Sequence, residues 1–181
     1  MLVCLLNLAQ LVLFLQKNLY FYHSMAKRLK KLDIPYLLDF HYSDWWADPE
    51  HQNIPKAWKD LSVDAMAQEL FAFTEQALLA LKEADVYPDM IQIGNEIRNG
   101  MLFPVAKVPK WENLAKLVNS GIAAARKVNA DTKLMIHLDE GATYAYYEEW
   151  FDHMMAQGMT DFDVIGLSYY PYIHGSFSDF E

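Results

Sequence analysis

The chain has 181 residues, 53% of them hydrophobic, which is enough for a single domain with a buried core. Its formal net charge of −9 argues against a nucleic-acid partner, because phosphate backbones bind clustered Lys and Arg, and the one basic cluster, residues 27–31, lies at the end of a predicted helix, where cations are favoured anyway. The single cysteine, Cys4, excludes an internal disulfide framework and a multi-cysteine metal site.

The N-terminal segment, residues 1–22, is atypical and differs from the rest of the chain. Residues 1–15 are apolar like the core of a signal peptide, but no positive charge precedes them and no small-residue cleavage site follows. Asn7 and Gln10 interrupt a run that is already short for a membrane span, so we expect no membrane contact. The segment is compatible with a damaged start, a targeting sequence or a buried helix.

Residues 23–181 form the predicted domain, because no repeat, low-complexity tract or linker divides them.

Four apolar runs predict buried strands of a parallel sheet, and each run ends in polar residues. The runs cover residues 35–41, 90–97, 133–139 and 163–170. The polar residues at their ends are Asp39 and His41, Asn95 and Glu96, His137 and Asp139, and Ser168, Tyr169 and Tyr170. Because the carboxyl ends of parallel strands meet at one rim, where barrel enzymes hold their catalytic residues, we expect these side chains to converge.

Three helical patterns lie between these strands, each with apolar residues at spacings of three and four. The apolar residues are Leu70, Phe73, Ala77 and Leu81 after a plausible N-cap at Ser62; Leu114, Val118, Gly121, Ala125 and Val128; and Tyr147, Trp150, Phe151 and Met154. Strands that alternate with helices predict a parallel sheet with right-handed crossovers. A complete (β/α)8 barrel needs about 250 residues. The predicted fold class is therefore α/β, an incomplete (β/α)8 TIM barrel of about four βα units of parallel sheet.

The residues alone leave several functions open. Glu96 is placed for chemistry at a strand end, although a helix cap or an ion pair with Arg98 explains it equally well. A metal-dependent barrel hydrolase is a second possibility, but the paired His-x-His of such sites is absent. Its ligands would be Asp39, His41, His137 and Asp139. A Schiff-base aldolase needs a lysine in the pocket, and Lys133 lies at the opposite end of its strand.

Three motifs occur along the chain: Leu-Leu-Asp-Phe-His-Tyr-Ser-Asp at 37–44 with Trp-Ala-Asp-Pro at 46–49, Gln-Ile-Gly-Asn-Glu-Ile at 92–97 with Asn-Gly-Met-Leu at 99–102, and Phe-Asp-Val-Ile-Gly-Leu-Ser-Tyr-Tyr-Pro-Tyr at 162–172. In these motifs and in their order, the chain from Met25 onward resembles the endo-β-1,4-galactanases. These arabinogalactan-cleaving enzymes are (β/α)8 barrels of glycoside hydrolase family 53. Three separate motifs rarely coincide by accident.

The resemblance implies a retaining hydrolase of the β-1,4-galactosidic bonds in galactan or arabinogalactan, located outside the cell. Glu96 matches the acid/base of the family, and the nucleophilic glutamate is expected on a later strand beyond Glu181. No metal ion and no cofactor are expected. The alternative is an inactive truncated fragment that retains some carbohydrate binding.

The other strand-end residues are predicted to bind substrate, and each also has a structural interpretation. Asn95 would reach the sugar 2-hydroxyl. His41 and His137 either contact the sugar or are satisfied core histidines, and Asp39 is either a buried partner of His41 or part of the pocket. Tyr169 either holds the nucleophile of an intact enzyme or packs as an aromatic residue. Trp45, Trp46, Trp58 and Tyr172 are candidates for stacking on sugar rings. The alternative is that these same residues anchor loops or pack in the core. Asp139 and Glu140 are expected to be solvated loop charges.

Overall fold

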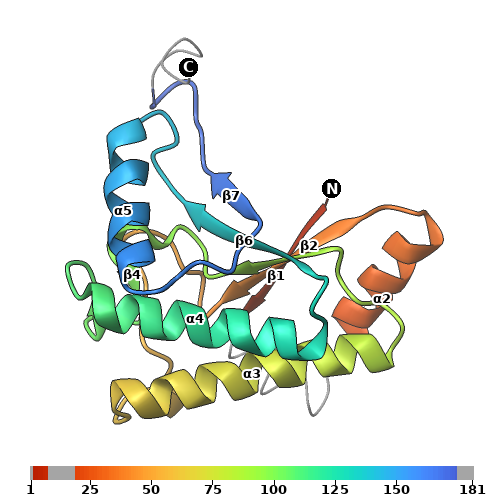
Figure 1. Cartoon of the computed structure of the whole chain (residues 1–181). Coiled ribbons are helices and arrows are strands. Elements are labelled where there is room, and N and C mark those ends of the chain that lie inside the picture. Colours follow the sequence, from red (N-terminus) through yellow and green to blue (C-terminus); the bar gives the residue numbers. More distant parts are fainter. Residues whose placement is uncertain (1, 8–18, 175–181) are drawn as a thin grey trace.

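The computed structural model describes residues 2–7 and 19–174. Its centre is a parallel five-stranded sheet with the order β1-β2-β3-β6-β7, so neighbours along the chain are also neighbours in the sheet. The strands are β1 (Leu2–Asn7), β2 (Tyr36–His41), β3 (Met90–Ile93), β6 (Lys133–Leu138) and β7 (Val164–Leu167). The last four are the predicted strands, and their sequential order is that of an incomplete (β/α)8 barrel (Figure 1).

The first strand, β1, was not predicted from the sequence. It pairs in parallel with β2, from Leu2 opposite Tyr36 to Asn7 opposite His41. The edge of β2 supplies hydrogen-bond partners for the backbone N–H and C=O groups of this segment, and this pairing is visible only in three dimensions. The alternative of a buried helix is therefore wrong for residues 2–7, whereas residues 8–18 lie outside the described residues.

The helices that connect the strands follow the predicted periodicities. They are α2 (Leu19–Lys31), α3 (Val63–Glu83), α4 (Trp111–Val128) and α5 (Tyr144–Ala156). The predicted N-cap is confirmed, since the hydroxyl of Ser62 accepts a hydrogen bond from the backbone N–H of Ala65 at 3.2 Å. The basic residues 27–31 lie in the last turns of α2, where the helix dipole favours them. No helix among the described residues is long and apolar enough to cross a membrane.

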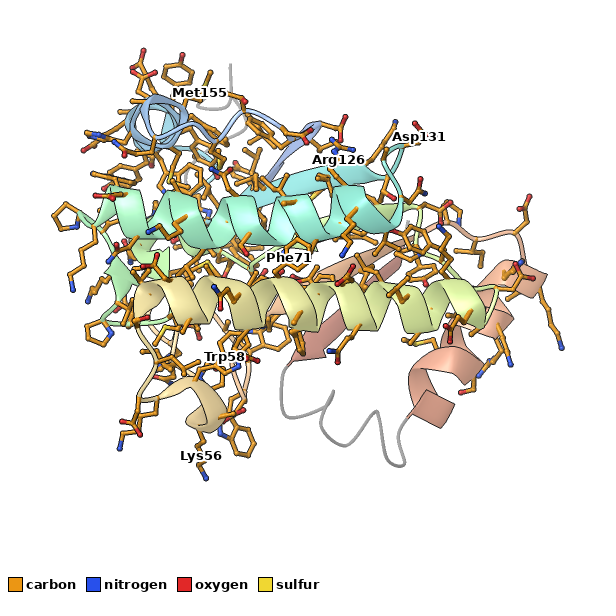
Figure 2. The ribbon with its side chains drawn as sticks, turned by 60° about the horizontal axis from the view of Figure 1, so that its bottom comes forward. Lys56, Trp58, Phe71, Arg126, Asp131 and Met155 are labelled. Atoms are coloured by element: carbon orange, nitrogen blue, oxygen red, sulfur yellow. The ribbon has the colours of Figure 1, made fainter. Side chains whose placement is uncertain are left out.

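Helices α3 and α4 lie side by side across one face of the sheet (Figures 1 and 2). Phe71 of α3 lies between the two helices, with Lys127 Nζ of α4 at 5.3 Å from its ring centroid. Gly121 allows α4 to approach the sheet closely, because a Cβ at this position would lie 2.8 Å from Ile93 Cγ2 and 2.9 Å from the Tyr42 hydroxyl.

The two faces of the sheet differ in chemistry, because side chains alternate along each strand. The face toward the helices is apolar and buried, with Leu38, Phe40, Ile91, Ile93, Leu134, Ile136 and Leu138 all at most 3% exposed. The opposite face, which would line the inside of a barrel, carries Asp39, His41, Gln92 and His137 near the carboxyl ends of their strands. The fold therefore directs a row of polar side chains to one rim.

Strand β7 exposes apolar side chains on the face that helices cover elsewhere. Ile165 and Leu167 are 47% and 39% exposed, and their parallel partners on β6 are Ile136 and Leu138, which are fully buried. Residues opposite each other in a parallel pair lie on the same face of the sheet. An exposed apolar edge strand is a site of self-association.

We expect the 181-residue chain to self-associate through this strand at micromolar concentration. The double variant Ile165→Lys/Leu167→Lys should reduce association, because it places two charges on the exposed face. Sedimentation velocity at several concentrations measures the effect. The matched control is Gln68→Lys/Gln157→Lys, which adds the same charge at an exposed position of α3 and at the exposed residue directly after α5. A monodisperse wild-type monomer with a sharp cooperative melt would contradict the expectation.

Candidate active site

The predicted convergence of the strand ends is confirmed. Residues from the ends of β2, β3, β6 and β7 form one continuous network of hydrogen bonds, in the order His41, Asp39, Gln92, Asn95, His137, Ser168 and Glu96. The Ser168 hydroxyl, adjacent to Tyr169 in the chain, lies 2.5 Å from Glu96 Oε1. The exits of β3 and β7 therefore meet at the same rim.

Glu96 has an unusual backbone conformation. Its φ of 50° and ψ of 49° lie in the left-handed region, which costs a non-glycine residue about 1–3 kcal/mol. The following short helix, η3 (Ile97–Asn99), holds it there: Ile97 is fully buried, and its carbonyl accepts a hydrogen bond from Trp150 Nε1 at 3.2 Å. Such strain is concentrated at functional sites. The Glu96 side chain makes no capping hydrogen bond to η3, so the interpretation of this residue as a cap is not supported.

Asn95 has a fixed orientation. Its Nδ2 donates to the carbonyl of Ala47 at 2.8 Å, and its own carbonyl accepts from Gln52 Nε2 at 2.8 Å. The side-chain Oδ1 therefore faces His137 Nδ1 at 2.9 Å and Gln92 Nε2 at 3.2 Å. The side chain is only 7% exposed, so Asn95 connects the loop after β2 to the end of β6.

His41 and Asp39 form a buried pair at the end of β2. His41 is fully buried; its Nδ1 accepts from the backbone N–H of Ala47 at 2.8 Å, and its Nε2 lies 2.9 Å from Asp39 Oδ2. Because Nδ1 is an acceptor, the proton is on Nε2 and is donated to Asp39. The other oxygen, Asp39 Oδ1, accepts from Gln92 Nε2 at 2.7 Å. Of the two interpretations for each residue, the geometry favours the buried structural one.

His137 connects Asn95 to Ser168. Its Nδ1 lies 2.9 Å from Asn95 Oδ1 and its Nε2 lies 3.0 Å from the Ser168 hydroxyl. Burial lowers the pKa of His137 below its ordinary value, against the opposing effect of the nearby carboxylates of Asp39, Glu96 and Asp139. The neutral imidazole is therefore the favoured form near neutral pH.

Asp139 corrects a prediction from the sequence. It was expected to be a solvated loop charge, but it is only 8% exposed. Its Oδ1 accepts a hydrogen bond from Arg98 Nε at 2.9 Å, and its Oδ2 accepts one from Arg98 Nη2 at 3.0 Å. The Arg98 guanidinium also lies over the Tyr146 ring at 4.9 Å. A buried carboxylate requires such a partner. Arg98 therefore pairs with Asp139 rather than with Glu96, which leaves the Glu96 carboxyl to Ser168.

The aromatic residues divide into exposed and buried ones. Trp45 and Trp46, in the loop after β2, are 75% and 63% exposed, and the Trp46 ring lies edge-on to His41 at 5.1 Å. Tyr172 is fully exposed. Trp58 is 4% exposed and packs against Phe73, so it is a core residue. Tyr169 is half-buried with its ring 6.2 Å from that of His174.

Within the described residues, no three His, Cys, Asp or Glu side chains are grouped as metal ligands would be. The two carboxylates of the suggested metal site have other partners: Asp39 is hydrogen-bonded to His41 and Gln92, and Asp139 is hydrogen-bonded to Arg98. This arrangement does not favour the metal-dependent hydrolase.

Three residues, two in the network and Arg98 beside it, were not identified as site residues from the sequence. Gln92 is a polar residue inside an apolar strand, and this break in the apolar pattern is the sequence signal that marks it. Ser168 was noted only as a strand end, and Arg98 only as a partner of Glu96. The contacts of Ser168 and Arg98 join residues 72 and 41 positions apart, and a single sequence carries no signal for such pairs.

Comparison with known proteins assigns this architecture to a family. The model of glycosyl hydrolase family 53 matches residues 12–181. An uncharacterised protein encoded in the bgaB 5′ region of Niallia circulans is 45% identical over 161 residues, which are 84% of this chain and 44% of that protein. An arabinogalactan endo-β-1,4-galactanase of Thermothelomyces thermophilus is 36% identical over 164 residues, which are 88% of this chain and 49% of the galactanase.

A solved structure shows the same relation in three dimensions. The family 53 catalytic domain of Ignisphaera aggregans superposes with a TM-score of 0.84 at 40% identity, over 88% of this chain and 44% of that domain. The chain thus spans about half the length of the relatives it matches. Because the family model covers nearly all of its residues and the fold agrees, the chain belongs to glycosyl hydrolase family 53.

Proposed function

We propose that this chain carries the acid/base half of the active site of a retaining endo-β-1,4-galactanase, acting on galactan or arabinogalactan outside the cell. The observation that carries the proposal is Glu96, held in a left-handed conformation at the end of β3 with its carboxyl on the Ser168 hydroxyl. In the proposed role, Glu96 protonates the oxygen that leaves from the cleaved galactoside.

A retaining glycosidase needs a second carboxyl group about 5–5.5 Å from the first to attack the anomeric carbon. Asp39 and Asp139 are poor candidates, because each is buried and its carboxylate already accepts hydrogen bonds from at least one neighbouring side chain. We therefore assign the nucleophile to the part of the barrel that the relatives have in addition to these residues.

The remaining strand-end residues are assigned to the substrate or to its surroundings. Trp46 is exposed beside His41 and offers a flat ring for the apolar face of a galactose unit. Asn95, His137 and Tyr169 surround the rim near Glu96, while Asp39 and His41 hold the loop that carries Trp46. The alternative function is an inactive fragment that binds galactan without cleaving it.

A comparison of two proteins tests the proposal. One is the 181-residue chain, and the other, called the completed enzyme below, is residues 12–181 joined to the parts of the Thermothelomyces thermophilus galactanase that the chain does not cover. We expect the completed enzyme to release galacto-oligosaccharides from β-1,4-galactan and the chain alone to release none.

Two outcomes would contradict the proposal. A folded completed enzyme that cleaves no galactan would show that the rim around Glu96 is not a galactanase site. Hydrolysis by the 181-residue chain itself, lost on Glu96→Gln, would show that a carboxylate within these residues is the nucleophile, with Asp39 and Asp139 to be tested first.

A further inference from the structure

Ser168 lies between the two titratable groups of the rim. Its hydroxyl is 2.5 Å from Glu96 Oε1 and 3.0 Å from His137 Nε2. A serine hydroxyl has one hydrogen, so it can donate to only one of these groups at a time. The contact with the other group forms a hydrogen bond only if that group donates to the serine oxygen.

The protonation of His137 Nδ1 is fixed by its partner. Asn95 uses its Nδ2 on the carbonyl of Ala47, which turns Oδ1, an acceptor, toward His137 Nδ1. Nδ1 therefore carries a proton. A neutral His137 then has its lone pair on Nε2, facing the Ser168 hydroxyl.

Two arrangements of hydrogens satisfy both contacts of Ser168. With a neutral His137, the serine donates to Nε2 and accepts from a protonated Glu96. With a protonated His137, Nε2–H donates to the serine, which donates to the Glu96 carboxylate. Both arrangements contain the same number of protons. When one proton fewer is present, one of the two contacts has no hydrogen, and two lone pairs face each other.

The surroundings select between the two arrangements. The charged and titratable groups that face His137 are Asp39 and His41 from β2, Glu96 after β3, and Asp139 at the end of its own strand. Asp39 is already hydrogen-bonded to His41 and Gln92, and Asp139 is paired with Arg98. With these two carboxylates satisfied and the ring half-buried, the neutral imidazole is favoured. Both contacts of Ser168 are then hydrogen bonds when the shared proton lies on Glu96.

We propose that Ser168 is a positioning residue whose hydroxyl couples the proton of Glu96 to the neutral form of His137. This proposal rests on the proposed acid/base role of Glu96. When Glu96 gives its proton to the leaving oxygen, its O–H bond breaks and the Ser168 hydroxyl turns from His137 Nε2 to the new carboxylate. When Glu96 later takes a proton from the attacking water, the hydroxyl turns back to Nε2. Ser168 thus serves both halves of a retaining reaction without losing its own proton.

The experiment uses the 181-residue chain and nuclear magnetic resonance, with ¹⁵N in the histidine rings and ¹³C in the glutamate carboxyls. In the wild type, we expect His137 Nδ1 to be protonated and the Nε2 signal to change in the same pH step as the Glu96 carboxyl carbon. The reason is that loss of the shared proton removes the hydrogen bond to Nε2. In Glu96→Gln, this step in the Nε2 signal should vanish.

Ser168→Ala should separate the two signals, because no hydroxyl then links the Glu96 carboxyl to His137 Nε2. Ser168→Thr, which keeps the hydroxyl, should restore the coupled step. Ser120→Ala is the matched control, because it removes a serine hydroxyl that is bonded to Ala67 between α3 and α4, away from the rim. Amide spectra check the fold, and Ser168→Cys, with a weaker donor, replaces the alanine variant if that variant does not fold.

An unchanged Nε2 titration in the folded Ser168→Ala or Ser168→Cys variant, or an unprotonated Nδ1 in the wild type, would overturn the coupling. Neither result bears on whether Glu96 is the acid/base, because that role is tested separately by galactan hydrolysis in the completed enzyme. Conversely, a coupled titration in the chain would support the coupling even if the Glu96→Gln variant of the completed enzyme were fully active. That full activity would contradict the proposed function alone.

Discussion

Glu96→Gln in the completed enzyme is expected to reduce hydrolysis of β-1,4-galactan by about a hundredfold to ten-thousandfold, the usual contribution of general acid catalysis. The amide keeps the shape of the side chain and has no proton to give to the leaving oxygen. Substrate affinity should be largely unchanged, because the lost interaction matters mainly in the transition state. The rate constant kcat and the dissociation constant of a galacto-oligosaccharide, measured separately, distinguish these two effects.

An activated substrate provides the internal control. An aryl galactobioside with a good leaving group needs little protonation, so its glycosylation step should be far less affected by Glu96→Gln. Equal losses on galactan and on the aryl substrate would indicate that the substitution disturbs the site as a whole. A Glu96→Gln enzyme with full activity on galactan would exclude Glu96 as the acid.

Trp150→Ala is expected to lower the free energy of unfolding of the chain by about 3–5 kcal/mol. Trp150 is the largest fully buried side chain in the part of the chain whose burial is described, residues 24–174. It packs edge-on against Phe151 with ring centroids 5.0 Å apart, and donates from Nε1 to the carbonyl of Ile97. The alanine variant removes this packing and leaves the Ile97 carbonyl without its donor. Because small domains are stable by only about 5–15 kcal/mol, the variant would lose a large part of its stability.

Chemical denaturation followed by circular dichroism measures this loss. Trp150→Phe keeps most of the packing and removes the hydrogen bond, so its loss should be smaller. Trp45→Ala is the matched control, because that tryptophan is 75% exposed and its removal should change the free energy of unfolding by less than about 0.5 kcal/mol. A loss below about 1 kcal/mol for Trp150→Ala would contradict the view that this residue anchors the segment after Glu96.

Much of the fold could be predicted from local patterns. The apolar runs ending at His41, Glu96, Asp139 and Tyr170 became four parallel strands, because short apolar runs that alternate with helical patterns favour a parallel sheet. The spacing of apolar residues after Ser62 predicted α3, since periodicity and capping act within a few residues of one another. The three motifs at residues 37–49, 92–102 and 162–172 together indicated the family.

The sequence by itself therefore determined the alternation of strands and helices, the polar rim and the family, all of which depend on neighbours in the chain. The tertiary structure alone decided that residues 2–7 form a strand, that Asp139 is buried with Arg98, and that Ser168 lies between Glu96 and His137. Each of these contacts joins residues about 30 or more positions apart, and its geometry depends on how the strands align in the sheet and on the path of the loops after them. No local pattern of residue types encodes these distances, so the proton network of the rim emerges only when the sheet is assembled.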